Sequence, residues 1–136
     1  MEFKLTKKDK TKLNALGVVA LYIFGSRVQG VAGPLSDYDF AVLMKEAGHK
    51  RGGKAYDQLY DILAPLCPRT LDNDIIDIVF LHDVPLELKL HVVRYGRVLY
   101  ETNTLTRLRF ETQTQLEYSD FRPLLDMQDQ AILSAL

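Results

Sequence analysis

The sequence lacks the features that mark several common protein classes. Its 136 residues contain a single cysteine, Cys67, so no intramolecular disulfide can form, and this predicts a protein of the reducing cytoplasm. It has no cluster of cysteine and histidine for zinc. It also has no Walker A lysine motif and no GxGxxG, which argues against a P-loop NTPase and a Rossmann cofactor site. No apolar run approaches the roughly 20 residues that a membrane helix needs.

Charge and composition also argue against classes of protein with a strongly biased composition or net charge. The formal net charge is −1, with 47% hydrophobic and 26% charged residues, which is ordinary for a globular protein. A chain with this balance has no overall field that would attract nucleic acid strongly. The N-terminal segment MEFKLTKKDK is basic but no apolar stretch follows it, so no signal peptide is expected. The length predicts one compact domain over residues 1–136.

The pattern of apolar residues predicts helices that alternate with three or four short strands. Thr6 and Asp9 resemble a capping box and Gly17 is a natural helix end, which predicts a first helix between them. Further helices are expected at about 53–66, 85–95 and 103–136, the last interrupted at Pro123, and strands at 18–24, 37–44, 75–81 and 97–100. Together these elements make an α+β (or α/β) domain, with helices packed on a small mixed β-sheet.

One segment, Leu21 to Leu43 (LYIFGSRVQGVAGPLSDYDFAVL), holds the first candidate site residues. Gly25 and Ser26 directly follow an apolar strand, and a short helix that began there would present free backbone N–H groups to a phosphate. The next strand opens with Asp37 and Asp39, whose side chains leave the same face because they are two residues apart. Two adjacent carboxylates repel each other, and a divalent cation such as Mg²⁺ removes that repulsion.

Asp77 adds a third carboxylate on a different strand. It lies in the apolar run Ile75 to Leu81, where a charged group is costly unless it is paired or bound to metal. With Asp37 and Asp39 it could hold two Mg²⁺ ions, which can activate an attacking hydroxyl and stabilise a leaving pyrophosphate. With a Gly-Ser phosphate site beside these carboxylates, the predicted chemistry is phosphoryl or nucleotidyl transfer.

Each feature alone has a simpler interpretation. An Asp-x-Asp is most often a solvated strand end, and a Gly-Ser pair after a strand is usually only a turn. Asp77 could instead form a salt bridge with one of three arginines, Arg69, Arg94 or Arg97. The order and spacing of the features together favour a nucleotidyltransferase site.

The combined motif resembles the DNA polymerase β-like nucleotidyltransferase superfamily. Phe24-Gly25-Ser26, then ten residues, then Asp37-Tyr38-Asp39-Phe40 matches its hG[S/G]…Dh[D/E]h signature. Ile76-Asp77-Ile78 resembles the third carboxylate on the following strand. The short length and the segment GSRVQG…SDYDFAVL are similar to the minimal nucleotidyltransferase (MNT) antitoxins, and a softer similarity extends into VVRYGRVLYE and RFETQTQLEYSDF. The resemblance implies the polymerase β-like nucleotidyltransferase fold.

The resemblance also implies a role for each matched residue. The Gly25–Ser26 turn would hold the triphosphate of ATP, and Arg27 is a candidate for a further phosphate contact, with a structural ion pair as its alternative. Asp37 and Asp39 would bind both Mg²⁺ ions. Asp77 would bind the catalytic metal and help to deprotonate the acceptor hydroxyl.

A function and a partner follow from the same resemblance. Active MNT antitoxins transfer AMP from ATP to a tyrosine of a HEPN-domain RNase toxin. The chain is therefore expected to be an Mg²⁺-dependent protein adenylyltransferase, the antitoxin of a toxin–antitoxin pair that forms a hetero-oligomer. Two alternatives stay open: a nucleotidyltransferase that acts on a small molecule or an RNA end, and a non-catalytic antitoxin that blocks its partner by binding.

Two further predictions concern the C-terminal segment and the residues His82 and Asp83. Only about 55 residues follow the third strand, too few for the acceptor-binding lobe of larger superfamily members, so a partner could supply the acceptor. In that segment the apolar residues before Phe121 are expected to cap the sheet, and residues 123–136 to contact a partner or a second copy. His82 and Asp83 are expected to serve a turn, with an approach to the site as the alternative.

Overall fold

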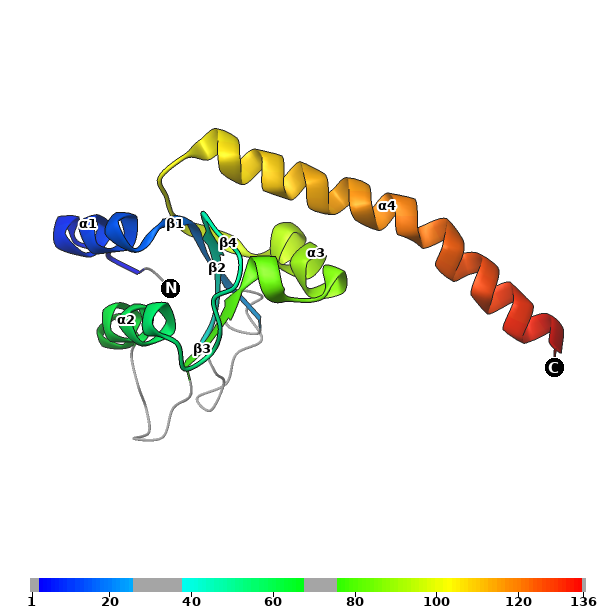
Figure 1. Ribbon diagram of the computed structural model, residues 1–136, viewed down its shortest axis with the longest axis horizontal. Helices are drawn as coiled ribbons and strands as arrows, with labels where there is room; N and C mark the ends of the chain where they lie inside the picture. Colours follow the sequence, from blue (N-terminus) through cyan, green and yellow to red (C-terminus); the bar gives the residue numbers. More distant parts are fainter. Residues whose placement is uncertain (1–2, 26–37, 68–75, 136) are drawn as a thin grey trace.

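The computed structural model describes residues 3–25, 38–67 and 76–135, with side chains described as far as residue 120. In chain order the elements are α1 (Lys7–Leu16), β1 (Val18–Phe24), β2 (Tyr38–Met44), α2 (Lys54–Leu63), the 3₁₀ turn η1 (Ala64–Leu66), β3 (Ile76–Phe80), the 3₁₀ turn η2 (Leu81–Asp83), α3 (Leu86–Tyr95), β4 (Arg97–Glu101) and α4 (Thr104–Ala135). The predicted α+β domain, with helices on a small mixed sheet, is confirmed (Figure 1).

The four strands form one sheet in the order β3-β2-β1-β4. β1 is antiparallel to both of its neighbours, β2 and β4, whereas β2 and β3 are parallel. A parallel pair needs a long crossover, and α2 lies within this one. As a consequence, β1 ends at the edge of the sheet where β2 and β3 both begin.

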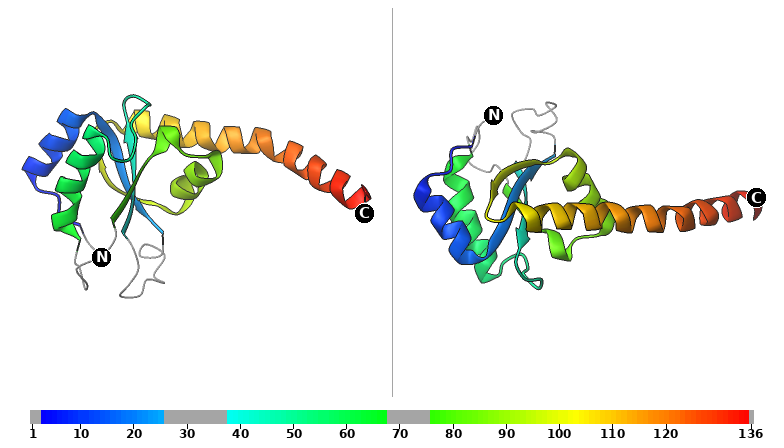
Figure 2. Two further views of the ribbon diagram at one scale, coloured as in Figure 1. Left: turned by 60° about the horizontal axis from the view of Figure 1, so that its bottom comes forward. Right: turned by 90° about the horizontal axis from the view of Figure 1, so that it is seen from above.

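β1 is buried along its whole length because helices cover both faces of the sheet. α1 and α2 lie on one side, and α3 with the first half of α4 lies on the other (Figures 1 and 2). Leu21 and Ile23 pack toward α1 and α2, whereas Tyr22 and Phe24 pack toward α3 and α4. A strand that is buried on both faces reads as a continuous apolar run, which is the pattern that predicted it.

The first helix begins and ends as predicted. The Thr6 hydroxyl accepts the Asp9 N–H at 3.1 Å, and the Asp9 carboxylate accepts the Thr6 N–H at 3.0 Å, so the capping box is complete. Gly17 ends the helix in the left-handed region, with φ of 87°. This sets the direction in which the chain enters β1.

Three predicted boundaries are corrected. The expected helix at 53–66 is the α-helix α2 followed by the 3₁₀ turn η1. The third strand ends at Phe80, and Leu81 is buried in η2 rather than in the strand. Pro123 does not interrupt the last helix, because α4 runs through it as one helix of 32 residues. A proline removes one backbone donor, and the hydrogen bonds on either side of it keep the helix continuous.

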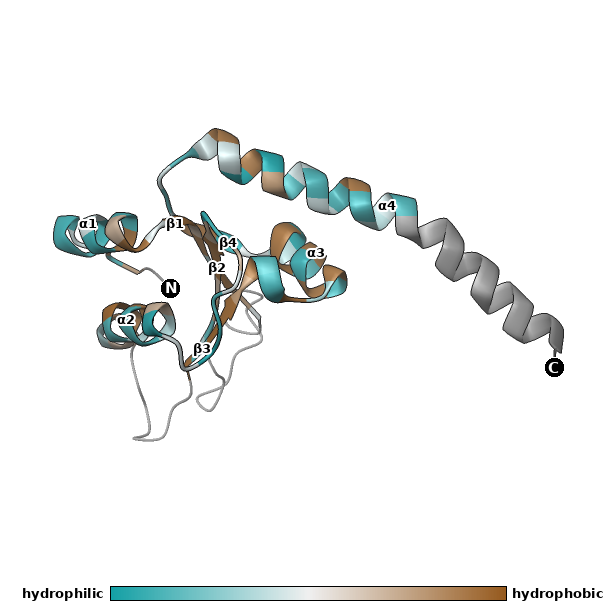
Figure 3. Ribbon diagram, viewed as in Figure 1, coloured by the Kyte–Doolittle hydropathy of each residue, from teal (hydrophilic) through white to brown (hydrophobic). Residues whose placement is uncertain are grey.

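α4 extends beyond the domain (Figure 1), and the expectation that its apolar residues before Phe121 cap the sheet is confirmed for Phe110 but wrong for three leucines. Phe110 and Thr114 pack against the domain. In contrast, Leu105, Leu108 and Leu116 are 57%, 46% and 56% exposed. Apolar and polar residues alternate along the helix as far as residue 120 (Figure 3). Among the described residues, none of the helices could span a membrane.

Candidate active site

Two of the three predicted carboxylates meet at one edge of the sheet. Asp39 on β2 and Asp77 on β3 are direct partners in the parallel register, so their Cα atoms are about 4.8 Å apart. Tyr38 and Phe40 point into the core beneath α1 and α2, so Asp39 points to the opposite face. Both carboxylates are half-buried. Their like charges lie close together in a setting that water screens only in part.

Gly25 is the third component of this edge. It follows β1 directly, and Phe24 is the register partner of Asp39. Its φ is +86°, a left-handed conformation that favours glycine. A Cβ at this position would overlap the Asp39 carboxylate oxygen Oδ2. The backbone of the turn therefore approaches the carboxylate as closely as only glycine allows. We call the group Gly25, Asp39 and Asp77 the carboxylate edge.

Within the described ranges no ion pair joins Asp77 to Arg94 or Arg97, two of the three arginines in the simpler interpretation of this residue. The guanidinium of Arg94 lies over the ring of Tyr118, 5.6 Å from its centroid. Arg97 is on β4, separated from β3 by two strands. The third candidate, Arg69, lies outside the described residues.

Half of the predicted site lies outside the residues that the structure describes. These positions are Ser26, Arg27, Asp37 and the short helix expected after Gly25. In the described part of the chain, no group of three or more histidine, cysteine, aspartate or glutamate residues could hold a metal ion. The two carboxylates that are described still fit Mg²⁺, since they offer hard oxygen ligands side by side at the end of rigid strands.

His82 and Asp83 serve a turn, as expected. The Nε2 of His82 lies 2.8 Å from the carbonyl oxygen of Met44, and the Asp83 carboxylate accepts the Gly48 N–H at 3.3 Å. These contacts tie η2 to the last residue of β2 and to the segment that follows it. Because Met44 ends β2 whereas Asp39 lies near its start, these residues are at the opposite end of the sheet from the carboxylate edge.

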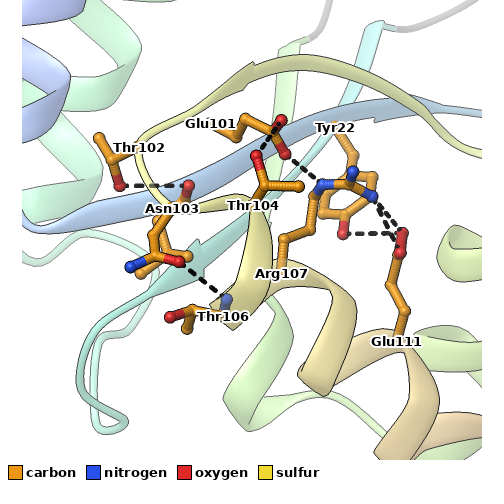
Figure 4. A network of polar contacts seen from close by, with 9 residues as sticks. Tyr22, Glu101, Thr102, Asn103, Thr104, Thr106, Arg107 and Glu111 are labelled. Carbon is orange, nitrogen blue, oxygen red and sulfur yellow. Dashed lines mark hydrogen bonds and ion pairs between the residues drawn. The ribbon is translucent and has the colours of Figure 1, made fainter.

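A second polar cluster, absent from the sequence-based expectations, attaches α4 to the sheet (Figure 4). Arg107 forms ion pairs with Glu101 and with Glu111, the latter at 2.9 Å. The Tyr22 hydroxyl donates to Glu111 at 3.3 Å. Burial, and then the nearby Glu111 carboxylate, raise the pKa of the Tyr22 phenol, so it stays protonated as a donor. The i,i+4 spacing of Arg107 and Glu111 was the signal available in the sequence.

We call these four residues, Tyr22, Glu101, Arg107 and Glu111, the anchor cluster. Glu101 pairs in register with Ala20, near the start of β1, so the cluster lies toward the other end of the sheet from the carboxylate edge. A cavity of about 860 Å³ also lies elsewhere. It is lined by α1, α2 and the segment after β2, and it contains neither Asp39 nor Asp77.

Comparison with protein families gives a match over most of the chain. The family model described as "Polymerase beta, Nucleotidyltransferase" matches residues 7–105. That range includes the carboxylate edge and all four strands. No curated protein matches the chain.

Several solved structures share the fold. A chain of the MntA–HpeT toxin–antitoxin, in a variant with one tyrosine replaced by alanine, is 24% identical, with 97% of this chain and 98% of that chain covered and a TM-score of 0.64. A toxin–antitoxin with AMP-PNP is 24% identical over 93% of this chain and 96% of that chain, with a TM-score of 0.63. A tri-AMPylated Shewanella oneidensis HEPN toxin in complex with MNT antitoxin is 22% identical, with 96% of this chain and 98% of that chain covered and a TM-score of 0.56.

Proposed function

Since the chain belongs to the polymerase beta nucleotidyltransferase family, we propose that it is an Mg²⁺-dependent enzyme that transfers AMP from ATP to a tyrosine hydroxyl of a HEPN RNase toxin. It would act as the antitoxin of that pair, in the cytoplasm, where ATP is supplied. The observation that carries the proposal is the carboxylate edge, in which Asp39 and Asp77 lie side by side and Gly25 brings the backbone up to Asp39.

The residues divide the chemistry between them. Asp37, Asp39 and Asp77 would hold two Mg²⁺ ions, which would neutralise phosphate charge and acidify the acceptor hydroxyl. Asp77 takes the proton of that hydroxyl, and the freed oxygen forms a bond to the α-phosphorus of ATP. The bond from the α-phosphorus to the bridging oxygen breaks, and its electron pair leaves with pyrophosphate. Backbone N–H groups of the Gly25–Ser26 turn, with Arg27, bind the triphosphate throughout.

Two observations support a protein partner. Three of the similar solved structures are toxin–antitoxins, one of them with an AMPylated HEPN toxin. In this chain, α4 extends beyond the domain and exposes Leu105, Leu108 and Leu116. Exposed leucines at helical spacing are typical of a surface that another protein covers. We propose that this helix, including residues 123–136, contributes to the contact with the toxin.

The two alternatives make different predictions for the same site. An enzyme that acts on a small molecule or an RNA end would transfer nucleotide without any partner protein. A non-catalytic antitoxin would neutralise its toxin without ATP and would tolerate loss of the carboxylates. The pair Asp39 and Asp77 favours an enzyme, because two carboxylates at directly paired positions suit a divalent cation and nothing in a purely blocking role requires them.

The experiment that tests the proposal is transfer of α-labelled ATP, with Mg²⁺, to the proposed HEPN-domain partner. We expect label on that protein with the wild-type chain and none with Asp39→Asn. Label on a small molecule or on RNA in the absence of a partner would favour the first alternative. The second alternative would be favoured if Asp39→Asn inhibited the toxin without ATP and the wild type transferred no label to it.

A further inference from the structure

α3 lies beside the carboxylate edge. It packs on the face of the sheet to which Asp39 points, with Val92 in the same core cluster as Phe24 and Ala41. β4 begins two residues after α3 ends, and its first residue, Arg97, pairs with Ile23 near the end of β1. The last turns of α3 therefore lie at the same end of the sheet as Gly25 and the carboxylates.

His91 is the residue of α3 that reaches this end. Its ring packs edge-on against Phe24, with 6.2 Å between centroids and 75° between planes, and lies 5.2 Å from the ring of Tyr95. Phe24 directly precedes Gly25. The His91 side chain is half-buried, and neither ring nitrogen has a hydrogen-bond partner in the part of the chain that the structure describes. Ring packing fixes the imidazole while its polar atoms stay available.

The strand order determines on which side of the carboxylates the acceptor and the leaving pyrophosphate would lie. Across this end of the sheet, Asp77 on β3 comes first, Asp39 on β2 is next to it, and Gly25 follows β1. If Asp77 takes the acceptor proton, the acceptor lies on the β3 side and the α-phosphate lies over the two carboxylates. In-line displacement then places the leaving pyrophosphate on the β1 side. His91 borders that side, because α3 contacts β1 there.

We infer that His91 binds the pyrophosphate portion of ATP: a ring N–H donates to a β- or γ-phosphate oxygen and stabilises the charge that forms as pyrophosphate leaves. This inference rests on the proposed function. Nucleotidyl transfer ends with an electron pair, and hence negative charge, on the pyrophosphate oxygen, where a positioned donor is most effective. The nearby cation Arg94 is engaged over the Tyr118 ring instead, so it does not take this role.

The test separates ring packing from hydrogen bonding. His91→Phe keeps an aromatic ring against Phe24 and Tyr95 but has no N–H. His49→Phe is the matched control, because His49 is also half-buried and packs on an aromatic ring, that of Phe80 at 5.4 Å. Phe80 ends β3, at the far end of the sheet from Asp77. Binding of AMP-PNP and of AMP, each with Mg²⁺, is measured by isothermal titration calorimetry.

We expect His91→Phe to weaken AMP-PNP binding about tenfold, in the range of one charge-assisted hydrogen bond, and to leave AMP binding unchanged. His49→Phe should match the wild type for both ligands. Equal AMP-PNP affinity of His91→Phe and the wild type, or an equal loss for AMP and AMP-PNP, would overturn the inference. If the wild type binds neither nucleotide, the proposed function fails and the inference fails with it, which is a distinct result.

A second pair of variants tests the inference independently, in case His91→Phe does not fold. His91→Gln and His91→Met are similar in size, but only glutamine offers an N–H. The inference predicts tighter AMP-PNP binding by His91→Gln than by His91→Met, about fivefold or more. Equal affinities of the two variants would contradict it, because packing alone would then account for the role of His91.

Discussion

The carboxylate edge and the anchor cluster hold acidic side chains in two different arrangements. In the anchor cluster, Glu101 and Glu111 share the guanidinium of Arg107. At the carboxylate edge, Asp39 and Asp77 lie side by side, and Asp77 has no ion pair within the described ranges. The anchor cluster satisfies its own charges and so contributes to structure. The carboxylate edge places two carboxylates on neighbouring strands, an arrangement that suits a divalent cation.

This difference separates structural carboxylates from functional ones in a single small sheet. Carboxylates that share an arginine help to hold one conformation, whereas carboxylates placed to bind a ligand contribute to activity more than to stability. Substitutions at the two places should therefore have opposite consequences. Those at the carboxylate edge should remove activity and spare stability, and those in the anchor cluster should do the reverse.

The largest expected effect comes from replacing one carboxylate by its amide, first at the carboxylate edge and then in the anchor cluster. Asp77→Asn keeps the shape of the side chain but cannot take the acceptor proton, so nucleotide transfer should fall by about 10²–10⁴-fold. Its free energy of unfolding should stay within about 0.5 kcal/mol of the wild type or rise, because repulsion from Asp39 is lost. Transfer of α-labelled ATP and urea denaturation measure the two quantities.

Glu111→Gln is the matched change in the anchor cluster. It weakens the contacts with Arg107 and Tyr22, so we expect a loss of about 1–2 kcal/mol in stability and a transfer rate close to that of the wild type. If Asp77→Asn destabilised the protein as much as Glu111→Gln and kept its activity, the division of roles between the two places would be wrong.

The next effect in size separates two glycines that share a backbone conformation. Gly25 and Gly17 have φ of +86° and +87°, so alanine at either position should reduce stability by about 1–2 kcal/mol. A Cβ at Gly25 overlaps the Asp39 carboxylate, whereas a Cβ at Gly17 meets no atom within 4 Å. We therefore expect Gly25→Ala alone to lower nucleotide transfer, by about 10²-fold, because it displaces that carboxylate.

Thermal unfolding and the transfer assay on both alanine variants provide the comparison. Equal activity of Gly25→Ala and Gly17→Ala would mean that the close approach of Gly25 to Asp39 has no catalytic role. An equal loss of activity in both would point to a general effect of reduced stability instead.

Local patterns in the sequence predicted the features that depend on neighbouring residues. The seven apolar residues of β1 and the capping box at Thr6 each follow from period and side-chain chemistry. The proximity of Asp39 and Asp77 is a long-range property. It depends on the strand order and the parallel register, and only the resemblance to a known superfamily implied it.

The orientation of α4 could not be predicted for a related reason. Helical periodicity identifies two stripes on this helix, one with Arg107, Phe110 and Thr114 and the other with the three exposed leucines. A rule that buries apolar residues favours the leucines. The domain takes the mixed stripe instead, because the buried Tyr22 hydroxyl needs an acceptor and Glu111 supplies it. That need is visible only once β1 and α4 are placed side by side.

The smallest expected effect is a change in how stability depends on pH. The hydrogen bond from Arg107, and then the one from Thr104, lowers the pKa of Glu101 in the folded protein. A lowered pKa contributes stability at pH values above the unfolded pKa of about 4.3, and this contribution is lost as the pH falls through the folded pKa. Because the Glu101 side chain is 30% exposed, we expect the contribution to be about 1 kcal/mol or less.

Arg107→Met should raise the pKa of Glu101 toward its ordinary value, since it removes the largest cause of the shift. NMR titration of the Glu101 carboxyl carbon measures this pKa directly. Arg109→Met is the control, because Arg109 is exposed and has no ion pair among the described residues, and it should leave the titration unchanged. The rate of nucleotide transfer at neutral pH should be the same in both variants, as expected if the anchor cluster holds α4 in place and the carboxylate edge performs the chemistry. A Glu101 pKa that stayed low in Arg107→Met would mean that Arg107 does not neutralise this carboxylate, and the contrast between the two places would then rest on Glu111 alone.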